Sequence, residues 1–139
     1  MAMRFRDLNT CEPPANLPRL VEGEYTFLWY SGIWDGPTSG MLLYMGNESW
    51  FEMFQENEDD KSLDKWYRRF AVLVLTSEQL AREREVHEDF LRHVATHMDP
   101  GRPRSIRPKE EHHLFYDKHL DYCQHRNFDE NEALAWFER

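Results

Sequence analysis

Residues 24–55 read EYTFLWYSGIWDGPTSGMLLYMGNESWFEMFQ and are rich in the aromatic residues that favour β-strands. Two breaks divide this stretch. The DGPTSG segment at residues 35–40 combines glycine, proline, aspartate and serine, which is a dense turn signal. Gly46 and Asn47 suit a two-residue hairpin loop, because both tolerate positive φ at low cost. We therefore predict an antiparallel meander with strands at 25–31, 41–45 and 49–55.

The rest of the chain predicts one further strand and several helices. Residues 66–75 form the most apolar stretch, whose second half lacks alternation and so indicates a central strand covered on both faces. Thr76 and Gln79 make a capping box for a helix over 77–98. Helical segments are also predicted at 111–125 and from Phe128 onward. The expected fold is α+β: a four-stranded antiparallel β-meander followed by a long helix and C-terminal helical segments that pack on the sheet.

Length and composition favour a single α+β domain over residues 1–139. Its expected parts are an irregular arm (1–22), the sheet (24–75), the helix (77–98) and a linker with C-terminal helices (101–139). Hydrophobic residues make up 40% of the 139 residues and aromatic residues 14%, which is enough for one core. The net charge of −9 argues against direct binding of nucleic acid. The two cysteines and the lack of a long apolar run favour a soluble cytoplasmic protein without membrane contact.

The charge distribution favours a protein partner. The loop at 56–64 (ENEDDKSLD) is strongly acidic, and one helix is too little to cover both faces of an aromatic sheet. We expect a non-enzymatic interaction module of the immunity, antitoxin-like or phage-inhibitor type, bacterial or phage in origin, which binds a basic protein. No catalytic residue and no cofactor is predicted. The expected binding surface comprises Trp29, Trp34, Asp35, Trp50, Glu52, Glu58, Asp59 and Asp60.

A small enzyme or ligand-binding domain is the alternative, with a pocket on the aromatic face of the sheet. Trp29, Trp50 and Glu52 would line this pocket and Asp35 would lie at its mouth. A glutamate between two aromatic residues of a strand is unusual, since burial of an unpaired carboxylate is costly. A salt bridge from Glu52 to Arg68 or Arg69 on the neighbouring strand would explain it without a site, and we prefer that explanation.

The spacing of two histidines suggests a metal site as a further hypothesis. His93 and His97 are four residues apart, so on a helix they would share a face and could both reach one metal ion. The chain has no H-E-x-x-H motif, and histidines near the end of a helix also favour its dipole. We therefore predict no metal site. A homodimer formed through a face or edge of the sheet is kept as an alternative partner.

Overall fold

The computed structural model describes residues 3–8, 14–33, 37–57, 67–99, 102–105 and 107–139, with the backbone alone at 33, 57, 96–99 and 102–105. The elements are β1 (Met3–Arg4), α1 (Phe5–Leu8), β2 (Tyr25–Ile33), β3 (Pro37–Tyr44), β4 (Asn47–Asn57), β5 (Tyr67–Leu73), α2 (Ser77–His93), β6 (Ala95–Asp99), β7 (Arg102–Ser105), the short 3-10 helix η1 (Lys109–Glu111), α3 (His113–His125) and β8 (Glu132–Glu138).

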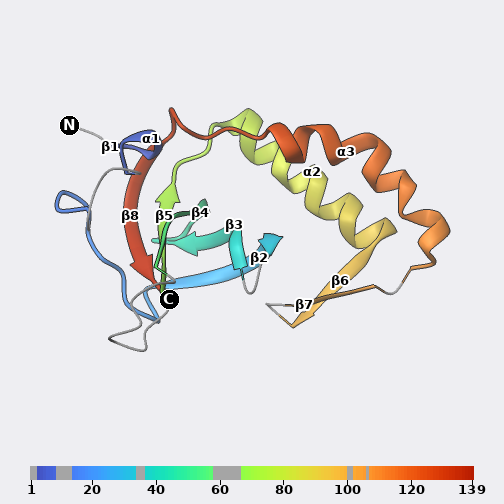
Figure 1. Ribbon diagram of the computed structural model, residues 1–139, viewed down its shortest axis with the longest axis horizontal. Helices are drawn as coiled ribbons and strands as arrows, with labels where there is room; N and C mark the ends of the chain where they lie inside the picture. The colour runs from blue at the N-terminus through green and yellow to red at the C-terminus, as the bar shows by residue number, and fades with distance from the viewer. Residues whose placement is uncertain (1–2, 9–13, 34–36, 58–66, 100–101, 106) are drawn as a thin grey trace.

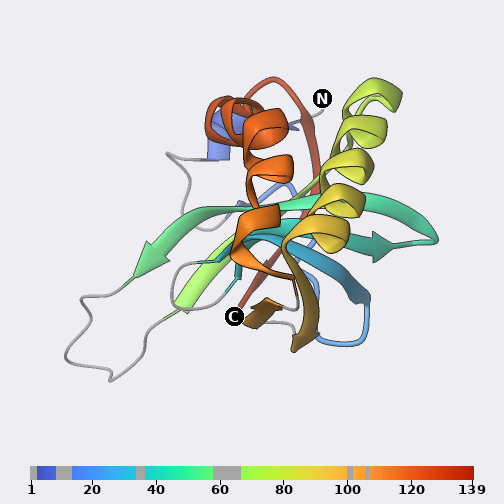
Figure 2. The ribbon, with the colours of Figure 1, turned by 90° about the vertical axis from the view of Figure 1, so that its right-hand side faces the viewer.

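Among these residues, six strands form one antiparallel sheet in the order β1-β8-β5-β4-β3-β2. The helices α2 and α3 lie beside each other on one side of this sheet, and the β6–β7 hairpin extends from the end of α2 (Figures 1 and 2). The α+β class is therefore confirmed, whereas the predicted number of four strands is wrong.

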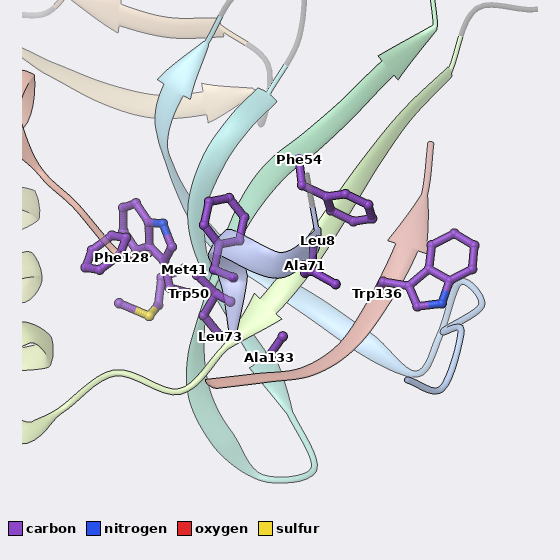
Figure 3. Packing of buried hydrophobic residues seen from close by; sticks show 10 residues of the cluster. Leu8, Met41, Trp50, Phe54, Ala71, Leu73, Phe128, Ala133 and Trp136 are labelled. Carbon is purple, nitrogen blue, oxygen red and sulfur yellow. The ribbon is translucent and has the colours of Figure 1, made fainter. Parts of the chain in front are cut away.

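Side chains from five strands form a continuous row on the face toward the helices. The register aligns Trp29, Met41, Trp50, Leu73 and Ala133, which belong to β2, β3, β4, β5 and β8 in turn. These residues pack in one core cluster, part of which appears in Figure 3, where Trp50 lies beside Phe128. Alternation along the strands, together with a bulge in β2 between Phe27 and Trp29 that switches the face of the following residues, thus gives the aromatic stretch two distinct apolar faces.

The second face is buried by the curvature of the sheet itself. Tyr25 of β2 stacks on Phe137 of β8, with ring centroids 4.3 Å apart, although three strands separate β2 from β8 in the sheet. Phe27 also lies 5.9 Å from Phe137. Contacts between strands this far apart in a sheet require that it curl, as in a partly open barrel. Leu20, from the arm before β2, joins this inner cluster.

Gly40 permits the tight packing on which the curl depends. A Cβ at this position would overlap the carbonyl oxygen of Trp29 and would lie 2.9 Å from the ring of Phe51. The missing side chain therefore lets β2 approach β3 while the Phe51 ring fills the inner face.

The start of α2 confirms the predicted capping box. The Thr76 hydroxyl accepts from the Gln79 backbone N–H at 3.1 Å, and the Gln79 side chain accepts from the Thr76 N–H at 2.9 Å. The helix ends at His93, earlier than the predicted 98, since Val94 leaves helical geometry and Ala95 begins β6.

Two further predictions are corrected. Residues Glu132–Glu138 form strand β8 rather than a helix, because pairing with β5 overrides the helix propensity of EALAWFE. The β3–β4 turn contains Met45 and Gly46, not Gly46 and Asn47. Both turn residues have positive φ (51° and 78°), as a type I′ turn requires.

No helix within the described ranges is long and apolar enough to cross a membrane.

Candidate functional site

A pocket of about 260 Å³ lies between strand β2 and the helices α2 and α3. The three elements each supply part of its wall: Trp29, Tyr30 and Ser31 from β2, Val86, His87 and Phe90 from α2, and Phe115, Tyr116, Leu120 and Cys123 from α3. Its residues in β2 lie more than fifty residues before those in α2, which lie more than twenty before those in α3, so the sequence pattern alone did not bring them together.

Trp29 and His87 join the sheet to α2 within this wall. Their rings stack with centroids 4.1 Å apart and an interplanar angle of 7°. Trp29 points toward the helices because it lies in the same row as Met41 and Trp50. Stacked aromatic rings of this kind form a flat surface that suits another planar group.

Helix α3 forms another wall of the pocket. Phe115 packs edge-on against Phe90 of α2, with centroids 5.3 Å apart, and also edge-on against Tyr116 at 5.2 Å. Tyr116 and Leu120 are 41% and 43% exposed, whereas Phe115 is buried. The exposed pair thus marks the mouth of the pocket.

Cys123 ends the row of pocket residues on α3, and it is a half-buried free thiol. Burial raises the pKa of this thiol, an effect that the nearby Arg126 guanidinium opposes. A protonated thiol is a poor nucleophile, so Cys123 does not have the environment of a catalytic cysteine.

An ion pair between Glu83 and Arg126 lies close to Cys123. Arg126 donates to both carboxylate oxygens of Glu83 at 2.7 Å, and the Tyr122 hydroxyl donates to the same carboxylate at 2.6 Å. Burial, followed by the hydrogen bond to Glu83, raises the pKa of Tyr122 to about 12. The pair ties α2 to the segment between α3 and β8, and a fully satisfied network of this kind is rigid.

Glu52 lies on the same face of the sheet as Trp50. Its carboxylate accepts from the Trp50 Nε1–H at 2.7 Å, and the Arg126 guanidinium lies 4.9 Å from the Trp50 ring centroid. Burial raises the pKa of Glu52 to about 7, while the hydrogen bond from Trp50 and the charge of Arg126 oppose the rise. Glu52 is thus a partly buried acid whose raised pKa lies near neutral pH.

Glu52 does not form the predicted salt bridge to Arg68 or Arg69. In the sheet it is opposite Ala71, while Arg68 pairs with Glu56 and Arg69 with Glu138. The prediction failed because the register places the two arginines beyond the bulge after Met53.

A second buried polar group joins α2 to α3. His119 Nε2 lies 2.7 Å from an Asp89 carboxylate oxygen, and Lys118 contacts both Asp89 and Glu85 at 3.0 and 2.9 Å. The hydrogen bond to His119 lowers the pKa of Asp89 to about 2. Glu85, Asp89 and His119 are close enough to hold a cation, but the Lys118 ammonium already neutralises these carboxylates. We therefore assign no metal to them.

A larger cavity of about 540 Å³ lies where the two ends of the curled sheet meet. Arg19 and Glu138 in its wall pair with each other at 3.3 Å, and Arg139 lies over the Phe27 ring. Because Arg19 and Glu138 pair with each other, they do not favour a ligand of either charge in this cavity.

The residues predicted for the binding surface lie in different parts of the molecule. Trp29 lines the pocket, whereas Trp50 is fully buried in the core and so cannot belong to an exposed binding surface. Glu52 is close to Trp50 but does not line the pocket. Outside the described residues lie Trp34, Asp35, Glu58, Asp59 and Asp60.

His93 and His97 do not share a helix face. His93 is the last residue of α2 and His97 belongs to β6. The histidine that contributes to the pocket is instead His87.

Sequence reasoning missed the buried polar residues between the helices. Asp89 is only 6% exposed, although charged residues of an amphipathic helix are expected on its outer face. Glu83 did leave a signal, since it interrupts the apolar stripe of α2 between Leu80 and Val86. No sequence pattern indicated that Arg126 and His119 are buried, because their partners lie thirty or more residues away.

No protein-family model, curated protein or solved structure matches this chain.

Proposed function

We propose that the protein binds a small, largely apolar molecule in the pocket between β2, α2 and α3. The observation that carries this proposal is the convergence of aromatic side chains from three elements on one half-open pocket. Ligand sites are typically concave, mostly apolar and provided with a few polar groups, and their volumes begin at about 300 Å³. The pocket's volume of about 260 Å³ is close to that lower limit.

Binding rather than catalysis fits the chemistry of the walls. Burial raises the pKa of the Cys123 thiol, which disfavours the reactive thiolate, and the nearby Glu83 carboxylate is held in an ion pair with Arg126. A free, half-buried thiol also agrees with a reducing compartment, and we include a cytoplasmic location in the proposal.

Fluorescence of N-phenyl-1-naphthylamine, a neutral apolar dye that brightens on leaving water, tests the proposal. We expect saturable binding to the wild-type protein. Leu120→Trp should fill the mouth and weaken binding by about fivefold or more, because well-packed pockets tolerate little added volume. Leu114→Trp is the matched control, since Leu114 lies on α3 with similar exposure (47% against 43%) but outside the pocket.

Protection of Cys123 gives an independent readout. In a Cys11→Ser background, bound dye should slow alkylation of Cys123 by a neutral maleimide, measured by mass spectrometry. An unchanged alkylation rate at saturating dye, or equal losses of binding in the two tryptophan variants, would contradict the proposal.

Binding of a basic protein is the second candidate function. The outer face of α3 presents the exposed Leu114 together with Asp117 and Asp121, three and seven residues further along the helix. An apolar side chain flanked by carboxylates favours a partner with a complementary basic surface. Charge reversal at Asp117 and Asp121 should abolish any salt-sensitive association with such a partner and leave dye binding unchanged.

A further inference from the structure

From the charges around the pocket we infer that its ligand is neutral, planar and aromatic, with one hydrogen-bonding group. This inference rests on the proposed function and names the class of ligand. Among the ten lining residues that the structure describes, none is Asp, Glu, Lys or Arg.

Two charged residues beside lining residues, Arg126 near Cys123 and Asp89 next to Phe90, already have partners. Arg126 is bound by Glu83 through two hydrogen bonds of 2.7 Å. Asp89 is neutralised by Lys118 at 3.0 Å and by Arg92 at 2.9 Å. A charged ligand would therefore lose water without gaining a counterion, and burial of an uncompensated charge is strongly unfavourable.

The shape of the walls selects a flat ligand. The rings of Trp29 and His87 lie nearly parallel, whereas Phe90 and Tyr116 meet Phe115 edge-on. An aromatic ligand can stack on the first pair and meet ring edges on the other side, which are the two arrangements that aromatic groups prefer.

The polar groups on the walls are few and of a kind that suits a neutral partner. Ser31 and Tyr116 carry hydroxyls, each able to donate or accept a hydrogen bond. An amide or hydroxyl on the ligand can pair with them, whereas a carboxylate would find no Lys or Arg side chain among the described lining residues.

Two isosteric probes, 2-naphthamide and 2-naphthoate, test the charge preference directly. They have the same shape at neutral pH and differ in charge. We expect the amide to protect Cys123 from alkylation, in the Cys11→Ser background, at concentrations at least about tenfold lower than the carboxylate. Calorimetric titration should give the same order of affinity.

A charge introduced at the mouth supplies the matched test. Leu120→Lys should improve 2-naphthoate binding by about tenfold or more, because it provides the missing counterion. Leu114→Lys adds the same charge to the same helix outside the pocket and should leave both affinities unchanged.

The outcomes separate this inference from the proposed function. Equal binding of the two probes, or tighter binding of 2-naphthoate by the wild-type protein, would overturn the inference while leaving a ligand pocket in place. Binding of the dye with no protection by either naphthalene would likewise overturn the inference alone. Failure of all three compounds to bind would overturn both.

Discussion

The Glu52 carboxyl group lies on the helix-facing side of the sheet, hydrogen-bonded to Trp50 and near the charge of Arg126. Its pKa of about 7 exceeds the ordinary value of 4.5, chiefly because of burial. A folded state that holds the proton more tightly than the unfolded state loses stability when the proton leaves. Stability should therefore fall as pH rises from about 4.5 to about 7, and the loss should stay constant above that range.

Glu52→Gln should remove this pH dependence, because a glutamine side chain still accepts from Trp50 but cannot ionise. The rise of the pKa from 4.5 to about 7 corresponds to at most about 3 kcal/mol, less any screening by solvent. Denaturant unfolding should thus find the variant more stable than wild type at a pH of about 8 and similar to it at a pH of about 4. Glu132→Gln, at an exposed site, is the control. A wild-type profile that is flat between these pH values would contradict the prediction.

At the scale of elements, polar contacts join α2 to α3 in addition to the apolar cluster that contains Val86, Phe90 and Phe115. Glu83–Arg126, Asp89–His119 and the Lys118 pairs all connect α2 to α3 or to the segment after it. Arg82 also lies 4.6 Å from the Tyr122 ring. Both helices also line the apolar pocket, so the ion pairs that hold α3 against α2 help to position its walls.

Removal of one partner of the Glu83–Arg126 pair should be costly. Glu83→Ala should lower the free energy of unfolding by about 3–5 kcal/mol, because it leaves a buried guanidinium without a counterion. The double variant Glu83→Leu, Arg126→Met should recover much of this loss, since similar replacements of buried pairs are often neutral. Chemical denaturation of the single and double variants measures the coupling. Additive losses would show that the pair makes no joint contribution.

At the scale of the whole molecule, the curled sheet gives the protein two cores on opposite faces of the same strands. Tyr25 and Phe137 close the inner core between the two ends of the sheet. The outer core receives Phe5 and Leu8 from α1, and Phe128 from the segment before β8. Both chain ends therefore contribute to one sheet, so its stability depends on contacts between residues far apart in the sequence.

Phe137→Ala should destabilise the protein by about 3–5 kcal/mol, because it opens a cavity and removes the stacking across the sheet ends. Backbone amide hydrogen exchange should also become faster along β2, because this edge strand loses the contact between Tyr25 and Phe137. Leu28→Ala, at a position of β2 that is 40% exposed, should change stability by about 0.5 kcal/mol or less. Equal effects of the two substitutions would show that the sheet ends do not depend on each other.

Some features followed from local sequence alone. Alternating aromatic residues and turn signals between residues 24 and 55 predicted three of the strands, and residues 66–75 the next. Thr76 and Gln79 predicted the start of α2, because a capping box needs only residues three apart. Trp29 was identified as a candidate binding residue, since an aromatic side chain on a strand must face a core or a site.

Other features arose only in the tertiary structure. EALAWFE has the propensity of a helix and becomes a strand, because β5 offers an edge that buries Ala135 and Phe137. The second face of the aromatic stretch needs no further covering helix, since the sheet curls until Tyr25 meets Phe137. The pocket depends on the same long-range packing, because α2 and α3 have to be placed over Trp29 before His87 and Leu120 belong to one site. Local patterns predicted three strands within residues 24–55, although β3 begins at Pro37 rather than at 41, and contacts distant in sequence decided what each of their faces meets.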